Sequence, residues 1–138
     1  MSVEFVDTNI LVYAYDNTGG PRHVQARDLI TRLWKSGDGA LSVQVLKEFY
    51  AVVTRKISNP LSPTQARERL RNLSLWRVDI HSASDIVSAS ELSELHTISF
   101  WDALIVQSAC KLGATRLWSE DLQTGRRFGD TEICTPFT

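Results

Sequence analysis

Residues 3–13 read VEFVDTNILVY, an apolar stretch that is broken by the carboxylate of Asp7. Val3-Glu4-Phe5-Val6 is typical of a short buried strand, and the segment from Ile10 onward is typical of a helix. The stretch predicts an α/β fold in which a strand ends just before a helix begins. In open α/β sheets, ligands bind beyond the carboxyl ends of the strands, so Asp7 is a candidate binding residue. Its structural alternative is to cap the helix that follows.

The composition is that of one ordinary globular domain. The chain has 138 residues, of which 43% are hydrophobic and 22% charged, and both fractions are near the average for soluble folded proteins. This length suits one hydrophobic core, so we expect a single domain over residues 1–138. No apolar run approaches the roughly 18 residues needed to cross a bilayer, and no basic-then-apolar leader opens the chain. We expect a cytoplasmic protein without a membrane partner.

The charged and metal-binding residues restrict the partners. Lys and Arg total 15 against 16 Asp and Glu, a net charge of −1, so only a local basic patch could hold nucleic acid. Cys110 and Cys134 belong to no zinc-binding spacing and are predicted to be small core residues. The three histidines lack the i, i+4 spacing of a helical metal site. These patterns argue against a zinc centre.

Strand-like and helical segments alternate along the rest of the chain, which predicts a parallel sheet with helices on both faces. The clearest boundary is Ser62-Pro63-Thr64-Gln65, which combines a helix cap, an early proline and a glutamine at the third helical position. The second helix is predicted to bury Val24 and Trp34. We therefore expect a central, mostly parallel sheet of about five strands, with strands near 3–6, 40–42, 76–80, 115–118 and 133–134, and helices near 10–15, 22–35, 45–57, 62–75, 82–95 and 99–113.

Three further acids occupy places comparable to that of Asp7. Glu48 and Asp102 border the apolar stripes of two predicted helices, and Asp121 follows the strand that ends at Trp118. Carboxylates that converge repel one another, so a site holding several near neutral pH needs shared protons or a cation. An all-oxygen ligand set suits Mg²⁺ or Mn²⁺ rather than zinc. The chemistry that fits is phosphodiester hydrolysis by a metal-activated water.

Each of these acids also has a structural alternative. Glu48 could pair with Lys47 or Arg55, Asp102 could stabilise the start of a helix, and Asp121 could be a loop or cap residue. The other aspartates lack a comparable context and are predicted to be surface or turn residues: Asp16, Asp28, Asp38, Asp79, Asp85 and Asp130.

Four segments in chain order resemble the acidic motifs of PIN-domain nucleases. They are DTNILVY at 7–13, Glu48 within a helix, WDALI at 101–105 and SEDL at 119–122. The length and motif order are similar to those of VapC-type toxins of prokaryotic toxin–antitoxin pairs, and the resemblance covers nearly the whole chain. It implies a PIN-like fold whose metal-binding catalytic carboxylates are Asp7, Glu48, Asp102 and Asp121.

The resemblance also implies a reaction and partners. It implies an endoribonuclease that depends on Mg²⁺ or Mn²⁺, usually a homodimer, held inactive by a small antitoxin that fills the acidic groove. Asn9 and Ser119 would support the carboxylates, and Glu120 is the alternative ligand to its neighbour Asp121. The candidate RNA-binding residues are Arg126 and Arg127, which are close to Asp121 in sequence. The tryptophans are predicted to be core or dimer residues rather than platforms for bases: Trp34, Trp76, Trp101 and Trp118.

Two other classes of protein remain as alternatives. A strand-end Asp followed by Thr also resembles the nucleophile of haloacid-dehalogenase-type phosphatases, which need a second Asp where this chain has Asn9. The second alternative is a catalytically silent PIN-like module that binds RNA or a protein. Cleavage of RNA only when Mg²⁺ or Mn²⁺ is added would distinguish the nuclease from this module.

Overall fold

The computed structural model describes residues 2–138, which are built around one six-stranded sheet. The strand order is β3-β2-β1-β4-β6-β5, and neighbouring strands are parallel except for the antiparallel pair β5 and β6. The prediction of an α/β fold with a mostly parallel sheet is confirmed. The strands are β1 (Glu4–Val6), β2 (Gly39–Ser42), β3 (Arg77–Asp79), β4 (Arg116–Trp118), β5 (Arg127–Phe128) and β6 (Thr131–Cys134).

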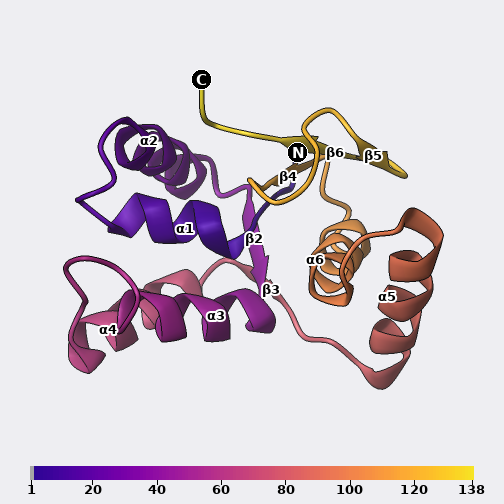
Figure 1. Cartoon of the computed structure of the whole chain (residues 1–138), viewed down its shortest axis with the longest axis horizontal. Coiled ribbons are helices and arrows are strands. Elements are labelled where there is room, and N and C mark those ends of the chain that lie inside the picture. The colour runs from indigo at the N-terminus through magenta and orange to yellow at the C-terminus, as the bar shows by residue number, and fades with distance from the viewer. Residues whose placement is uncertain (1) are drawn as a thin grey trace.

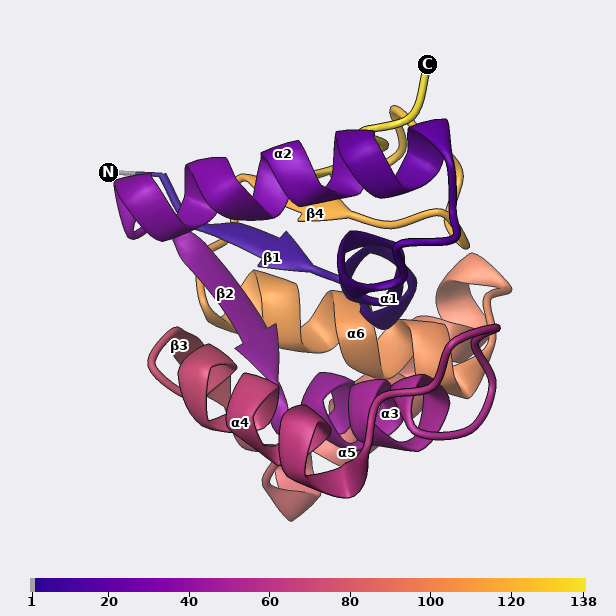
Figure 2. The same cartoon turned by 90° about the vertical axis from the view of Figure 1, so that its left-hand side faces the viewer.

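Helices cover both faces of the sheet, as predicted. Figure 1 shows α1 to α4 on one side of the strands and α5 and α6 on the other, and Figure 2 shows β1 leading directly into α1. The helices are α1 (Thr8–Tyr15), α2 (Pro21–Ser36), α3 (Val43–Val53), α4 (Pro63–Leu73), α5 (Ala83–His96) and α6 (Phe100–Lys111).

The strand order reverses between β1 and β4. The chain proceeds from β1 outward through β2 to β3 on one side, and β4 then pairs with the other side of β1. Helices α1 to α4 lie on one face of the sheet, whereas α5 and α6, which directly precede β4, lie on the other (Figure 1). This reversal leaves a crevice at the carboxyl ends of the two central strands, which is where ligands bind in open α/β folds.

Serine caps fix the starts of the helices near this crevice. The side chain of Ser42 accepts from the backbone N–H of Val45 at the start of α3, and Ser99 does the same for Asp102 at the start of α6. The predicted capping box of Ser62 and Gln65 is present at the start of α4. Because caps satisfy N–H groups that lack helical partners, these serines determine where each helix begins.

The end of α3 and the size of the sheet differ from the prediction. α3 ends at Val53 rather than near residue 57, and the chain beyond it turns with the backbone N–H groups of Arg55 and Lys56 sharing the carbonyl of Val52. The extra strand is β5, a two-residue strand that exists only through its pairing with β6. Such short pairing leaves no periodic pattern in the sequence.

Several predictions about burial are wrong. Val24 and Trp34 are exposed, because α2 buries a neighbouring stripe that contains Ala26, Leu29, Ile30 and Leu33. Cys110 is exposed because the buried stripe of α6 passes through Val106 and Ala109, and Cys134 at the end of β6 is only partly buried. Asp79, predicted to lie at the surface or in a turn, is only 4% exposed.

The apolar core lies against both faces of the sheet. Phe5, Leu41 and Leu117 of the central strands are fully buried, and Phe49 of α3 and Ile105 of α6 pack into the same cluster. This packing fixes the strand ends relative to α3 and α6. Among residues 2–138, no helix is long and apolar enough to cross a membrane.

Candidate active site

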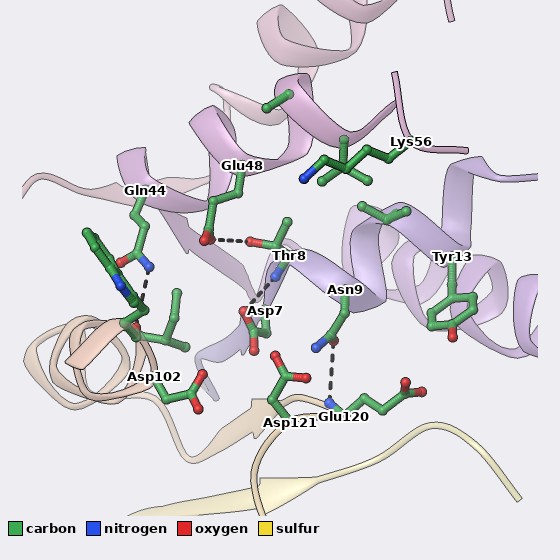
Figure 3. Close-up of a pocket in the computed structure, with 15 residues that line it drawn as sticks. Asp7, Thr8, Asn9, Tyr13, Gln44, Glu48, Lys56, Asp102, Glu120 and Asp121 are labelled. Atoms are coloured by element: carbon green, nitrogen blue, oxygen red, sulfur yellow. Dashed lines mark hydrogen bonds between the residues drawn. The ribbon is translucent and has the colours of Figure 1, made fainter. Parts of the chain in front are cut away.

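The four predicted acids line one pocket. It has a volume of about 500 Å³ and lies at the carboxyl ends of β1 and β4, between α3 and α6. Asp7 and Asp121 come from the strand ends, whereas Glu48 comes from α3 and Asp102 from α6. In Figure 3 the carboxylates of Asp7, Asp102 and Asp121 point toward one another across the pocket. Residues up to 114 positions apart in the chain therefore form one acidic pocket.

Asp7 is held by the backbone on one side and by a serine on the other. It is 4% exposed, its Oδ1 accepts from the backbone N–H of Thr8 at 2.7 Å, and its Oδ2 accepts from Ser119 Oγ at 2.8 Å. An N-cap side chain normally accepts from the second or third helical N–H, whereas Asp7 accepts from the first. Asp7 therefore caps α1 in part, and its carboxylate faces the pocket.

Ser119 connects the two strand-end acids. It is fully buried after β4, and besides donating to Asp7 its Oγ accepts from the backbone N–H of Asp121 at 3.1 Å. Asn9 links the same segments, because its Oδ1 accepts from the backbone N–H of Glu120 at 3.4 Å. The predicted supporting residues Asn9 and Ser119 thus both contact the acidic segments.

Glu48 is oriented by a residue that the sequence did not single out. Its Oε1 accepts from Thr8 Oγ1 at 2.8 Å. Among the ion pairs in residues 2–138, none involves Glu48, so the alternative of a partner in Lys47 or Arg55 is absent there. The position of Thr8 directly after Asp7 could have predicted this role, because a hydroxyl next to a strand-end acid lies at the same edge of the sheet.

The neighbouring acids Glu120 and Asp121 lie differently. Glu120 lines the rim of the pocket and forms an ion pair with Arg22 of α2, which also stacks over the ring of Phe137 at 4.7 Å. In Figure 3 the Glu120 side chain points away from the other acids, whereas Asp121 points toward Asp7 and Asp102. The geometry favours Asp121 over Glu120 as the inward-facing acid.

The buried acids have altered acidities. The pKa of Asp7 is raised to about 7, chiefly by burial and also by the nearby carboxylates of Asp121 and Glu48, against the lowering effect of its hydrogen bonds. Burial also raises the pKa of Asp102, with an added contribution from Asp121. A bound cation would reverse both effects, because it favours the charged form of each carboxylate.

The residues present fit a hard divalent cation. Besides Glu120 at its rim, the pocket offers the four predicted carboxylates, and no histidine or cysteine is among the described residues that line it. All-oxygen donors are what Mg²⁺ and Mn²⁺ prefer. The amide Nδ2 of Asn9 is buried without a hydrogen-bond partner within residues 2–138, so it is free to donate to a phosphate oxygen or a water. The fit is one of donor chemistry: as arranged within residues 2–138, no group of three or more acidic, histidine or cysteine side chains could hold a metal ion.

The predicted RNA-binding arginines lie outside the pocket lining. Arg126 donates to the backbone carbonyl of His96 and stacks over Phe128 at 4.8 Å, and Arg127 in β5 pairs with Glu132. Neither arginine is among the residues that line the pocket beside Asp121. The one cation among the described lining residues is Lys56, which the turn at the end of α3 places there (Figure 3).

Comparison with known proteins assigns the fold to a family. The PIN domain family matches residues 5–127, so the chain belongs to that family. No curated protein sequence matches the chain.

Three solved structures show how closely this chain resembles toxin–antitoxin proteins. VapC20 of Mycobacterium tuberculosis, a toxin that cleaves the sarcin–ricin loop, is 25% identical with a TM-score of 0.62 over 83% of this chain and 86% of that one. VapBC2 of Rickettsia felis, bound to promoter DNA, is 23% identical with a TM-score of 0.65 over 96% and 98%. A toxin–antitoxin complex from Klebsiella pneumoniae is 20% identical with a TM-score of 0.67 over 99% and 98%. The last two likenesses concern the fold.

Proposed function

We propose that this protein is a VapC-type toxin that hydrolyses RNA phosphodiester bonds with the help of Mg²⁺ or Mn²⁺. The observation that carries the proposal is the single pocket in which Asp7, Glu48, Asp102 and Asp121 meet, in a chain of the PIN domain family. The similarity to VapC20, a toxin that cleaves the sarcin–ricin loop, supports RNA as the substrate. Residues 1–138 would form one nuclease domain.

Different residues of the pocket would bind the metal, position the carboxylates and contact the phosphate. The four carboxylates would hold the metal, which when bound supplies a Lewis acid for a phosphoryl oxygen and a water of lowered pKa. Ser119 and Thr8 keep Asp7 and Glu48 in place through their hydroxyl groups. The free amide of Asn9 would donate to a phosphate oxygen, and Lys56 would attract the phosphate by its charge.

The lining of the pocket favours water as the nucleophile. The described lining contains no serine, cysteine or histidine, and the hydroxyl of Thr8 is committed to Glu48. Asn9 stands where an aspartyl phosphatase of the haloacid-dehalogenase type needs its second acid, and membership of the PIN family argues against that class. A catalytically silent module is the remaining alternative, and it leaves the convergence of four acids without a purpose.

The proposed partners follow from the toxin class. Proteins of this fold are seen in toxin–antitoxin complexes, and a small antitoxin whose basic or polar side chains fill the acidic pocket would block RNA. We further propose that the toxin acts as a homodimer in the cytoplasm, where its RNA substrate and its antitoxin are made.

The decisive experiment measures cleavage of a labelled single-stranded RNA and of a ribosomal RNA stem-loop by the purified protein. Cleavage should be absent in EDTA, appear when Mg²⁺ or Mn²⁺ is added, and stop again on chelation. RNA cleavage at full rate in EDTA would disprove the metal-dependent mechanism. Metal binding without cleavage of either RNA would favour the silent module.

Lys56→Ala should weaken RNA binding without changing the chemical step. Removing one phosphate contact is expected to raise KM about fivefold and to leave kcat unchanged. The slope of the logarithm of the binding constant against the logarithm of the salt concentration should become shallower by about one. The matched control is Lys35→Ala, because Lys35 is an exposed lysine in the last turn of α2 that does not line the pocket. If kcat falls and KM stays constant, Lys56 acts on the reaction rather than on binding.

A further inference from the structure

A second groove adjoins the acidic pocket. It has a volume of about 420 Å³ and shares three lining residues with that pocket, namely Gln44, Glu48 and Trp101. Its other walls include the apolar side chains of Ile80 and Leu104. A ligand whose phosphate lies at the carboxylates could therefore extend into this groove without leaving the protein surface. We call this second cavity the side groove.

Trp101 stands at the junction of the two cavities. It immediately precedes Asp102 in α6, and 63% of the residue is exposed although it is large and apolar. The ring of Phe100 packs against it edge-on, with ring centroids 5.3 Å apart and an interplanar angle of 70°. An edge-to-face contact covers at most one face of the indole ring, and the large exposed fraction of Trp101 leaves the other face available. Exposed aromatic faces beside a phosphate site are the usual platforms on which unpaired bases stack.

Gln44 supplies an unused acceptor at the same junction. Its Nε2 donates to the backbone carbonyl of Trp101 at 3.4 Å, which orients the amide. Its Oε1 is buried and has no hydrogen-bond partner within residues 2–138. A buried acceptor without a donor destabilises a protein unless a ligand supplies the donor. Every nucleobase carries an N–H group that could do so.

The side groove also has a positive charge where a neighbouring phosphate would lie. Lys47 lines it, one turn after Gln44 on α3, and takes part in none of the ion pairs found in the described part of the chain. An aromatic face, a free amide oxygen and a free cation together match one nucleotide. An apolar protein partner bound in the side groove would not need the Gln44 acceptor. It would also not need the groove to be continuous with the acidic pocket.

We propose that the side groove binds the base of an RNA nucleotide next to the scissile phosphate. The base stacks on Trp101, one of its N–H groups donates to Gln44 Oε1, and Lys47 contacts the adjoining phosphate. The proposal rests on the proposed nuclease function and adds to it a specificity-determining site outside the carboxylates. It assigns to Trp101 the role of a platform for a base, which the sequence pattern did not predict.

The test compares binding of two fluorescein-labelled 12-mers in Ca²⁺, one a single-stranded uridine oligonucleotide and the other its abasic counterpart. Wild-type protein should bind the uridine 12-mer about tenfold more tightly, because stacking on an aromatic ring depends on the base. Trp101→Ala should lose this difference by weakening only the uridine complex, and Trp101→Phe should keep most of it. Gln44→Leu should weaken the uridine complex without changing the abasic one.

The matched control is Leu95→Ala, which removes an apolar side chain that is 78% exposed on α5 and should leave both affinities unchanged. Equal binding of the two 12-mers by wild type, or no binding of either, overturns the proposal. It is also overturned if Trp101→Ala converts a dimer to a monomer in light scattering, because Trp101 would then belong to a protein interface.

A parallel cleavage assay with Mn²⁺ separates the two proposals. If wild type cleaves no RNA, the proposed function fails whatever the binding results. If wild type cleaves RNA and Trp101→Ala binds both 12-mers as wild type does, only the base site fails.

Discussion

Asp7→Asn should abolish RNA cleavage and at the same time stabilise the metal-free protein. We expect kcat to fall on the order of 10³-fold, because the most buried of the four carboxylates loses its charge and with it a ligand for the metal. Most substitutions of buried residues destabilise proteins. A variant that is inactive and more stable would therefore mark Asp7 as a residue kept for function.

The expected gain in stability follows from the acidity of Asp7. Its pKa rises from 3.8 to about 7 on folding, and at about 1.4 kcal/mol per pH unit this corresponds to about 4 kcal/mol of unfavourable ionisation at neutral pH. Asparagine can still accept from Thr8 but can no longer accept the second hydrogen bond from Ser119. After this loss we expect the free energy of unfolding to increase by about 1–3 kcal/mol.

The same acidity predicts how stability varies with pH. Between pH 4 and pH 7 the folded protein keeps a proton on Asp7 that the unfolded chain has released, so the folded state binds more protons. Stability should therefore fall as pH rises through this range and level off above the folded pKa. In Asp7→Asn this contribution disappears, and bound metal should suppress it in wild type because the cation favours the ionised carboxylate.

Urea unfolding in EDTA at several pH values measures these effects, together with initial rates of RNA cleavage in Mn²⁺. The matched control is Asp28→Asn, because the Asp28 side chain is 69% exposed on α2 and should affect neither property. Expression of the wild type should also arrest the growth of its bacterial host, and expression of Asp7→Asn should not. Retained cleavage combined with a large loss of stability would remove Asp7 from the active site.

The parts of the fold that the sequence predicted well depend on local chemistry. The capping box of Ser62 and Gln65 starts α4 where expected, because its hydrogen bonds lie within four residues of one another. Asp7 and Asp121 were placed correctly at strand ends, because parallel strands adjacent in a sheet end at the same edge. That the four acids line one pocket was therefore predictable, because they follow directly from strand ends and helix borders.

The parts that the sequence missed depend on contacts distant in the chain. Arg126 and Arg127, whose role in RNA binding stays a prediction, are close to Asp121 in sequence but do not line the pocket, and Arg127 pairs with Glu132 across the hairpin of β5 and β6. Lys56 enters the pocket because the backbone turns at the end of α3, where the N–H of Leu61 bonds to the carbonyl of Val53. Neither event leaves a periodic pattern in the residues themselves.

Asp79→Ala should cause a large loss of stability although Asp79 lies outside the pocket. Asp79 ends β3 and accepts from Ser108 Oγ at 2.8 Å and from Lys111 Nζ at 3.0 Å. Ser108 is fully buried in α6, and its Oγ also lies 2.7 Å from His81 Nε2. The hydrogen bonds join β3 to α6 beneath the surface. One acid within an alternating strand gave no sign of these hydrogen bonds, because the partners lie about 30 positions away.

Removing the Asp79 carboxylate leaves the buried Ser108 hydroxyl and the Lys111 ammonium without their shared acceptor, and we expect a loss of about 3 kcal/mol. Lys111 keeps Asp85 as a partner at 2.7 Å, which limits the loss. Asp79→Asn should lose only about 1 kcal/mol, because its amide oxygen still accepts from Ser108. The exposed Asp28, replaced by alanine, should change stability by less than about 0.5 kcal/mol.

Thermal and urea unfolding of Asp79→Ala, Asp79→Asn and Asp28→Ala measures these differences, and RNA cleavage is assayed well below each melting temperature. The folded Asp79→Ala protein should keep the kcat of wild type, because Asp79 does not line the acidic pocket. The opposite result, normal stability with lost cleavage, would make Asp79 part of the site. The contrast between Asp79 and Asp7, which are each 4% exposed, then gives a physical criterion for the role of a buried acid. An acid whose replacement destabilises the fold is structural. An acid whose replacement stabilises the fold is held ready for a cation.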